Sequence, residues 1–370
     1  MAEYYPLILF FVFLVLHGFP CPSQSSDLFN PRLQKAYVAL QAWKHSITCD
    51  PNQLTTDWDG PHVCNYTGVF CAPALDDANE LTVASIDLNQ GGICGVLPTH
   101  LGLLKDLSVF HINSNRFCGG LPETLSEMKL LHELDVSNND LSGPFPHVAL
   151  MMESLKFFDI RFNHFCGEVP ATLFAKKLDA IFINNNNFSS AVPANIGDSS
   201  VSVLVIANLD LHGCFPRSIS KMGDTLYELI LMNNGLFSCL PEDLGKLKKV
   251  RVFDISSNQI VGGLPESIGE MKSLEQLNVA HNKLSGEIPA SIFNLPRLEN
   301  FTYSDNYFCS EPDNYQNIKR IDDERNCLPD RPLQRSPEEC CSFLSEPVFC
   351  SLLPAKKNTS PPAKIPLPLH

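Results

Sequence analysis

The chain has 370 residues, of which 44% are hydrophobic and 18% are charged, so it can build a core and is not a disordered protein overall. Its 27 basic and 41 acidic residues give a formal net charge of -14. This charge argues against binding to nucleic acid or anionic lipid and favours a basic partner. Fourteen cysteines without metal-type clusters indicate an oxidising compartment.

The chain begins with an apolar run, PLILFFVFLVL, at residues 6–16. This run is too short to cross a bilayer core of about 30 Å, but it suits the centre of a signal peptide. We predict a signal peptide over residues 1–25 and therefore a secreted protein. The sequence contains no second run of membrane-spanning length, so we expect no membrane insertion. Residues 26–80, which include the amphipathic stretch LFNPRLQKAYVALQAWKHSI, are predicted to form an N-terminal cap.

An apolar-Pro pair recurs through the middle of the chain at steps of 23 to 25 residues. The prolines are Pro98, Pro122, Pro146, Pro170, Pro193, Pro216, Pro241, Pro265 and Pro289. Residues 274–297, LEQLNVAHNKLSGEIPASIFNLPR, match the plant form LxxLxLxxNxLxGxIP of the leucine-rich repeat. The period predicts an α/β solenoid, a right-handed leucine-rich repeat horseshoe of about ten 24-residue coils over residues 81–309, with disulfide-stapled caps.

Each consensus position has a structural role. Alternate apolar residues of a short strand point inward, and a polar residue at the following turn can satisfy buried backbone groups. The predicted ladder residues are Asn115, Asn139, Asn163, Asn186, Asn234, Asn258, Asn282 and Asn306. Leu209 and Gly91 stand where two coils would carry this asparagine, so we expect those coils to be locally irregular.

Residues that flank the two inward positions of each strand should face the concave surface. The acidic ones are Asp87, Glu133, Asp135, Asp159, Glu228 and Asp254, and the large apolar ones are Phe157, Phe162, Phe182, Val203, Val205, Ile230 and Met232. Exposed apolar side chains rimmed by carboxylates suit a basic amphipathic peptide. The alternative is that the acidic residues only keep the protein soluble and that the sheet tolerates the apolar ones.

The repeat also suggests pairings for the cysteines. Cys94 and Cys118 share one slot in adjacent coils, as do Cys214 and Cys239, and strands about 4.8 Å apart would allow both bridges. Buried thiols are the alternative. Cys309 and Cys327 flank a polar segment and are predicted to staple the end of the array, whereas Cys166 should be unpaired or bound elsewhere. Cys49, Cys340, Cys341 and Cys350 stay unassigned, and no ligand spacing suggests a metal.

Four sequons mark candidate glycosylation sites, at Asn65, Asn187, Asn300 and Asn358. Beyond the array we predict a cysteine-rich C-terminal cap over residues 310–353. Residues 354–370 are rich in proline and are predicted to form a disordered tail.

Three segments resemble a known family. They are CNYTGVFCAPALDD at residues 64–77, VASIDLNQGGICGVLPTHLGLL at residues 83–104 and DRPLQRSPEECCSFLSEPVFC at residues 330–350. The chain resembles the plant leucine-rich repeat extensins, and more closely their short relatives. The cap itself is similar to the N-terminal cap of plant extracellular leucine-rich repeat proteins, which implies a Cys64–Cys71 bridge.

The resemblance implies secretion into the apoplast and cell wall, and binding of rapid alkalinization factor peptides, which are small, basic and cysteine-rich. It also implies a part in wall integrity or growth signalling, with a cell-surface receptor kinase as a further partner. Full-length family members continue into Ser-Pro-rich extensin repeats, whereas here only Ser360-Pro361-Pro362 remains. Anchoring in the wall is therefore left open.

Other functions stay open beside peptide binding. The chain could inhibit a secreted polygalacturonase, because polygalacturonase-inhibiting proteins share the ten-coil architecture, or it could be a structural wall component. An unpaired thiol would allow a dimer. No catalytic motif stands in its required structural context, so we predict neither an enzyme nor a cofactor.

Overall fold

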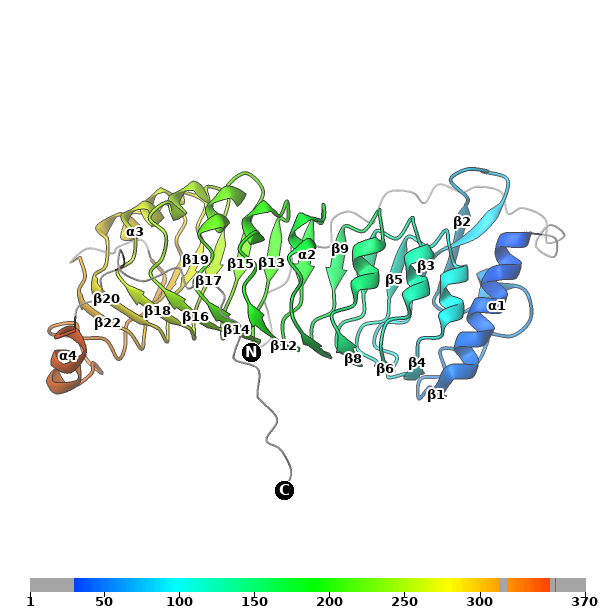
Figure 1. The fold of residues 1–370 in the computed structure, drawn as a ribbon, viewed down its shortest axis with the longest axis horizontal. Coiled ribbons are helices and arrows are strands. Elements are labelled where there is room, and N and C mark those ends of the chain that lie inside the picture. Colours follow the sequence, from blue (N-terminus) through cyan, green and yellow to red (C-terminus); the bar gives the residue numbers. More distant parts are fainter. Residues whose placement is uncertain (1–29, 313–317, 347–349, 351–370) are drawn as a thin grey trace, which may run out of the picture.

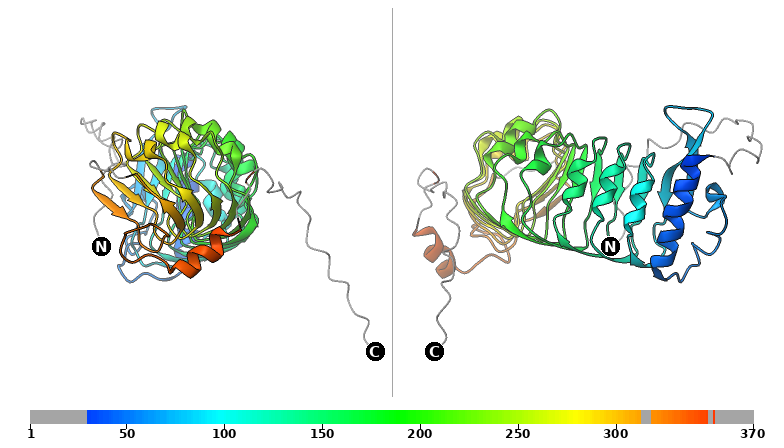
Figure 2. Two further views of the ribbon diagram at one scale, coloured as in Figure 1. Left: turned by 90° about the vertical axis from the view of Figure 1, so that its left-hand side faces the viewer. Right: turned by 45° about the vertical axis from the view of Figure 1, so that its right-hand side comes forward.

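The computed structural model describes residues 30–312, 318–346 and 350. The predicted signal peptide and the predicted tail lie outside these residues. The described chain forms a curved, slightly twisted rod of stacked coils, with one sheet on its concave side and a second sheet along another face (Figures 1 and 2). This architecture confirms the predicted leucine-rich repeat solenoid.

The first sheet, on the concave side, has 12 strands within the described residues. Its strands are β2 (Val69–Pro73), β3 (Leu81–Asp87), β5 (Val109–His111), β7 (Glu133–Asp135), β9 (Phe157–Asp159), β11 (Ala180–Phe182), β13 (Val203–Val205), β15 (Glu228–Ile230), β17 (Val252–Asp254), β19 (Gln276–Asn278), β21 (Asn300–Thr302) and β23 (Arg320–Asp322). All neighbours pair in parallel except β2 and β3. In the three-residue strands the central side chain is buried and the outer two point to the concave side.

The second sheet has 11 strands within the same residues. They are β1 (Ile47–Cys49), β4 (Cys94–Val96), β6 (Arg116–Gly119), β8 (Asp140–Pro144), β10 (His164–Gly167), β12 (Asn187–Ala191), β14 (Asp210–Gly213), β16 (Gly235–Ser238), β18 (Gln259–Gly262), β20 (Lys283–Glu287) and β22 (Tyr307–Ser310). The prolines of the repeat follow these strands and lead the chain into the next turn of the coil.

In each coil a short helical turn follows the strand of the second sheet and returns the chain to the concave sheet (Figure 1). Most are 3-10 turns: η3 (Thr99–Leu103), η4 (Glu123–Glu127), η5 (His147–Met151), η6 (Ile196–Asp198), η7 (Arg217–Met222), η8 (Leu244–Lys246) and η9 (Glu266–Glu270). Two coils have α-helical turns instead, α2 (Thr172–Ala175) and α3 (Ala290–Phe293). Apolar residues from these turns and from both sheets form one continuous core.

The predicted asparagine ladder runs through this core. Asn258 is typical: its Nδ2 donates to the carbonyls of Leu231, Ile255 and Ser256, and its Oδ1 accepts from the amide of Leu236. The turn thereby satisfies backbone groups that neither sheet reaches. Asn326 extends the ladder beyond the predicted last residue, because it accepts from Phe308 N and donates to Tyr303 O.

The two coils without this asparagine keep their strand pairing. Leu209 is buried, and β13 still pairs in register with β11 and β15. The predicted irregularity is found in the hydrogen bonds of the ladder. In the coil that follows Leu209, the ladder residue Asn234 has a buried Oδ1 without a hydrogen-bond partner. At Gly91 a Cβ would lie 2.9 Å from both Asn115 Oδ1 and a Leu54 methyl, so the first coil has no room for a larger residue.

The N-terminal cap closes the first coil with α1 (Pro31–Ser46). Asn30 caps this helix, and Pro31 follows at its first position. Trp43 is fully buried and lies 5.6 Å, ring to ring, from both Trp58 and Phe110. The cap therefore shares its core with the array.

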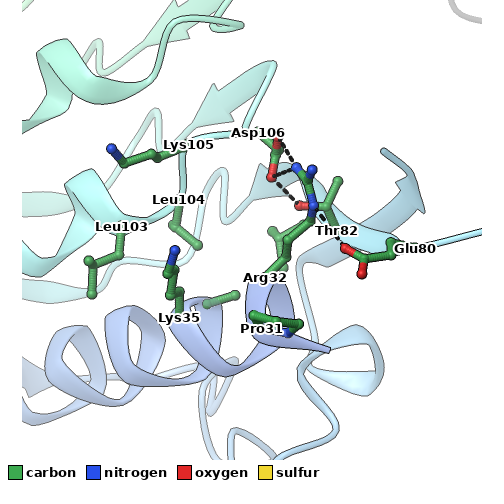
Figure 3. Close-up of a pocket in the computed structure, with 11 residues that line it drawn as sticks. Pro31, Arg32, Lys35, Glu80, Thr82, Leu103, Leu104, Lys105 and Asp106 are labelled. Atoms are coloured by element: carbon green, nitrogen blue, oxygen red, sulfur yellow. Dashed lines mark hydrogen bonds and ion pairs between the residues drawn. The ribbon is translucent and has the colours of Figure 1, made fainter. Parts of the chain in front are cut away.

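Arg32 binds two carboxylates of the cap, Asp76 and Glu80, and one of the first coil, Asp106; Figure 3 shows Glu80 and Asp106 beside it. Its guanidinium contacts Asp76 at 2.7 Å, Glu80 at 3.1 Å and Asp106 at 2.8 Å. The hydrogen bonds that Arg32 donates to Asp106 and Asp76 raise the pKa of Arg32 well above its ordinary value. Arg32, Glu80 and Asp106 line one side of a crevice between the cap and the first coil, so their charges are already paired with one another.

We expect Arg32→Ala to lower the free energy of unfolding by about 1–2 kcal/mol, because it leaves three clustered carboxylates without their shared cation. Thermal unfolding would measure the loss. Lys105→Ala removes an exposed pair with Glu127 and serves as the control, with an expected loss below about 0.5 kcal/mol. Equal losses in the two variants would contradict a special role for Arg32.

The structure corrects three of the four predicted disulfides. Cys64 pairs with Cys71, as the resemblance implied. Cys94 pairs with Cys49 of β1 and not with Cys118, which is an exposed thiol. The slot argument fails because neighbouring strands of the second sheet pair with an offset: Cys94 lies opposite Arg116, and Cys118 lies opposite Val96.

The same offset separates the second predicted pair. Gly213 lies opposite Leu236, so Cys214 does not face Cys239. Cys239 instead bonds Cys350, and Cys214 is a free thiol.

At the end of the array, Cys327 bonds Cys340 and not the predicted Cys309. The bridge forms because α4 (Pro337–Leu344) folds back beside the last coil, with Arg335 N donating to Asn326 O just before it. Cys309, Cys341 and Cys166 are exposed free thiols.

The concave sheet extends past residue 309, the predicted end of the array. Strand β23 pairs with β21 in the same parallel register as the earlier strands. The cysteine-rich segment therefore supplies one further strand and one further ladder asparagine before α4 begins. None of the helices in the described ranges is long and apolar enough to cross a membrane.

Candidate functional site

The concave face carries the predicted site residues in two rows. We call the last residues of the strands from β3 to β23 the third-position row. Strand pairing places them side by side: Asp87, His111, Asp135, Asp159, Phe182, Val205, Ile230, Asp254, Asn278, Thr302 and Asp322. The row is polar at the N-terminal end, apolar in the middle and polar again at the C-terminal end.

The parallel row of first positions contains Glu133, Phe157, Val203 and Glu228. Phe162 and Met232 lie just past their strands. Phe162 has a φ of 53° at the turn after β9 and is 50% exposed. It is the most accessible aromatic side chain among the predicted site residues.

The polar N-terminal end of the face contains an ion pair between His111 and Glu133. His111 Nε2 lies 3.0 Å from Glu133 Oε2. Burial by itself would lower the pKa of His111, but the neighbouring Glu133, together with Asp135 and Asp87, raises that pKa above its ordinary value. The contact with His111 in turn lowers the pKa of Glu133.

Two of the predicted carboxylates are buried and not open to a ligand. Asp135 is 9% exposed and accepts from Ser137 and Asn113. Asp159 is fully buried; Oδ1 accepts from Arg161 N, and Oδ2 lies 3.0 Å from Arg161 Nε. The prediction that both are surface charges is wrong because Ser137 and Asn113 bind the carboxylate of Asp135, and Arg161 lies against that of Asp159.

Burial also changes the chemistry of these acids. It raises the pKa of Asp159 to about 7, although Arg161 opposes the shift. Burial likewise raises the pKa of Glu228. Of the predicted acids on this face, Asp87 is exposed, whereas Glu133, Glu228 and Asp254 are partly exposed.

Aromatic side chains connect the polar end to the apolar middle. The Phe157 and Phe182 rings lie 5.5 Å apart, and the Arg161 guanidinium lies 4.9 Å from the Phe182 ring centre. Phe182 is only 7% exposed, so the prediction of an open aromatic there is wrong. Arg161 covers it through a cation–π contact.

The middle of the face is an apolar stripe that remains accessible. Val203, Val205, Ile230 and Met232 are each partly exposed on β13, β15 and the turn after β15. Apolar groups that touch water at the centre of a concave sheet favour a partner that would bury them.

The C-terminal end of the face is polar. Asp254 accepts from Ser256 and from Asn278 Nδ2 at 3.0 Å, so its carboxylate is held along the sheet. Asn300 stands at the first position of β21 and is partly exposed. A glycan on Asn300 would occupy this end of the concave face.

The other sequons differ in position. Asn65 and Asn187 are exposed, at the cap and at the start of β12. Asn358 lies outside the described residues.

Sequence reasoning missed His111 and Arg161, the two basic residues at the polar end. The signal was present: His111 occupies the same strand position as Asp87 and Asp135, and Arg161 occupies the same turn position as Met232. Both were left out because only acidic and large apolar residues at those positions were predicted to contact a ligand. Among the described residues, no group of three His, Cys, Asp or Glu side chains could hold a metal ion.

Repeated coils, disulfide-bonded caps and a partly exposed concave sheet define a leucine-rich repeat protein of the plant type. Three family models match the chain: "Leucine rich repeat N-terminal domain" over residues 34–72, "Leucine Rich Repeat" over 130–149 and "Leucine rich repeat" over 224–284. The N-terminal match coincides with α1, β1 and the Cys64–Cys71 bridge.

The chain belongs to the leucine-rich repeat extensin-like family. It is 57% identical over 366 residues to leucine-rich repeat extensin-like protein 6 of Arabidopsis thaliana, and the match covers 96% of this chain and 77% of that relative. It is 58% identical to leucine-rich repeat extensin-like protein 3 of the same plant over 93% of this chain, but that match covers only 46% of the relative. The functions of the longer relatives as whole proteins therefore cannot be assigned to this chain.

Solved structures with the same fold include plant receptor ectodomains. The leucine-rich repeat ectodomain of the Arabidopsis receptor kinase HAESA, in complex with an IDA peptide hormone, matches with a TM-score of 0.66 and 25% identity over 80% of this chain and 54% of that one. A plant ice-binding protein matches with a TM-score of 0.69 and 22% identity over 82% of this chain and 97% of that one, which shows the fold alone.

Proposed function

We propose that this chain is a secreted, non-enzymatic cell-wall protein whose concave face binds a basic, cysteine-rich peptide of the rapid alkalinization factor type. Through that peptide it would act in wall integrity or growth signalling, with a receptor kinase as a further partner. The observation that carries the proposal is the accessible apolar stripe of Val203, Val205, Ile230 and Met232, with the partly exposed carboxylates of Glu228 and Asp254 in the strands beside it.

The charges support a basic ligand. The chain carries a net charge of -14. Glu228 lies opposite Val203 and Asp254 lies opposite Ile230, and Asp87 and Glu133 lie further toward the N-terminal end, on β3 and β7. Such carboxylates would speed encounter with a cationic peptide, and the stripe would hold its apolar side chains. The HAESA ectodomain, which is similar in fold, forms a complex with the IDA peptide hormone, which supports a peptide as the class of ligand.

Phe162→Asn tests the apolar part of the site. Asparagine tolerates the positive φ of this turn, so the coil should stay intact while half-exposed aromatic surface is removed. We expect affinity for a labelled synthetic rapid alkalinization factor peptide to fall at least about tenfold, as for loss of an aromatic anchor. Met151→Gln removes a similarly exposed apolar side chain, at 47%, from η5 and should leave affinity unchanged.

Charge-neutralising changes test the acidic part. Glu133→Gln with Asp87→Asn should slow association and weaken its salt dependence, because steering by exposed carboxylates is screened by ions. The peptide titration should be run beside a polygalacturonase inhibition assay. Absence of peptide binding together with inhibition of the enzyme would replace this proposal with the inhibitor alternative.

A further inference from the structure

A groove with a volume of about 520 Å3 lies between the C-terminal helix α4 and the second sheet, away from the concave face. Val261 of β18 and Tyr307 of β22 contribute one wall. Phe343, Ser342 and Glu339 of α4, with Glu346 beyond it, contribute the other. The proposed peptide site does not use these residues.

The floor of the groove is a rigid aromatic stack. Tyr307 and Phe343 lie 3.6 Å apart, ring centre to ring centre, with an angle of 7° between their planes. Because Phe343 covers one face of Tyr307, the Arg335 guanidinium at 4.3 Å must cover the other. Stacked, immobilised rings present apolar surface at little entropic cost to a ligand that packs against them.

The rim of the groove is acidic. Glu339, Ser342 and Glu346 are exposed, and no described lining residue is basic. The Arg335 guanidinium that covers Tyr307 donates to Asn306 O. Glu339 is held in place by a capping box with Ser336, in which each side chain accepts from the backbone amide of the other. An aromatic floor between carboxylates selects an apolar or proline-containing segment that also carries positive charge.

A segment of this kind leaves the fold beside the groove. Cys350 is bonded to Cys239, and its Sγ lies next to Gly262, where an added Cβ would be 2.7 Å away. Gly262 is the immediate neighbour of the groove residue Val261. Residues 351–357 read SLLPAKK, and residues 351–370 contain three lysines and no acidic residue.

We propose that the groove between α4 and β22 is a docking site for a basic, proline-containing segment, and that its occupant is residues 351–357 of this same chain. Leu352, Leu353 and Pro354 pack against the aromatic floor, and Lys356 and Lys357 pair with Glu339 and Glu346. The disulfide to Cys239 holds the segment at one end of the groove, which gives it a high effective concentration there.

The test uses the full chain and a labelled synthetic peptide, SLLPAKK, as a competitor in a fluorescence anisotropy titration. In the wild-type protein the tail should compete, so the peptide should bind weakly. In a tail variant with Leu352→Ser, Leu353→Ser, Lys356→Gln and Lys357→Gln, the groove should be open, and the peptide should bind at least about tenfold more tightly.

A second set of changes locates the binding to the groove. Glu339→Gln with Glu346→Gln, added to the tail variant, should abolish the gain, and glutamine at position 339 keeps the capping box that starts α4. Glu338→Gln, on the same helix but outside the groove lining, should leave the gain intact. Equal peptide affinity in the wild type and the tail variant would overturn the proposal, as would a gain that survives the double glutamine change.

Analytical ultracentrifugation distinguishes docking of residues 351–357 in their own chain from docking in a second copy of the chain. The proposal expects the same sedimentation coefficient for the wild type and the tail variant at every concentration. A dimer that forms in the wild type and is lost in the tail variant would instead place the segment in a neighbouring molecule and overturn the proposed occupant.

Discussion

Replacing the ladder residue Asn258 with leucine should cost about 3–5 kcal/mol of unfolding free energy, because it leaves several buried backbone groups without partners. The amide of Leu236 and the carbonyls of Leu231, Ile255 and Ser256 all bind the Asn258 side chain. Leucine is similar in size but can neither donate nor accept. A urea titration followed by circular dichroism would show the loss as a lower midpoint.

The coil that carries Leu209 allows the opposite substitution, from leucine to asparagine at the ladder position. Leu209 occupies the ladder position there and is 7% exposed, while the next ladder residue, Asn234, has a buried Oδ1 without a hydrogen-bond partner. We expect Leu209→Asn to cost far less than Asn258→Leu, since the carbonyls around the new amide repeat those of the other coils. A larger loss in Leu209→Asn than in Asn258→Leu would show that the amide ladder is not what holds the turns.

The parts of the fold that repeat could be predicted from the sequence. The 24-residue period fixes which residues point inward, because each coil repeats the same strand and the same turn. For this reason the ladder asparagines and the two rows of concave residues lie where the spacing placed them. At these positions the sequence repeat and the packing of the coils both require the same type of residue.

The wrong disulfides mark the limit of this reasoning. Equal spacing means equal position only where neighbouring strands pair without an offset. In the concave sheet Val109 lies opposite Glu133, one full period away. In the second sheet Cys118 lies opposite Asp140, two residues short of a period. Neighbouring strands of the second sheet are shifted by two residues along their length. The spacing of residues in the sequence does not reveal this shift.

Burial of Asp159 and Phe182 was missed for a related reason. The consensus assigns both residues to the concave face, where an average side chain would meet solvent. Arg161, two residues after Asp159, lies against the carboxylate and over the ring, and it closes both off. Contacts between specific side chains on neighbouring coils decide exposure here, and the pattern describes only the backbone position.

Asp159 should make stability depend on pH in a way that its asparagine variant does not. Burial raises its pKa from 3.8 to about 7, so the folded protein binds a proton that the unfolded chain has released over this range. An acid whose pKa is raised by folding favours the folded state at low pH and loses that contribution as pH rises. The loss runs from near pH 4 to near pH 7 and totals up to about 4 kcal/mol at about 1.4 kcal/mol per pKa unit.

Asp159→Asn removes this titration while keeping the size of the side chain. The difference in unfolding free energy between variant and wild type should therefore move in favour of the variant as pH rises from 4 to 7. Comparing the two proteins at each pH cancels the contribution of acids with opposite shifts, such as Glu133 with its lowered pKa. A constant difference across the range would mean that Arg161 keeps Asp159 ionised in the fold, and that the buried carboxylate contributes a permanent negative charge to the concave face.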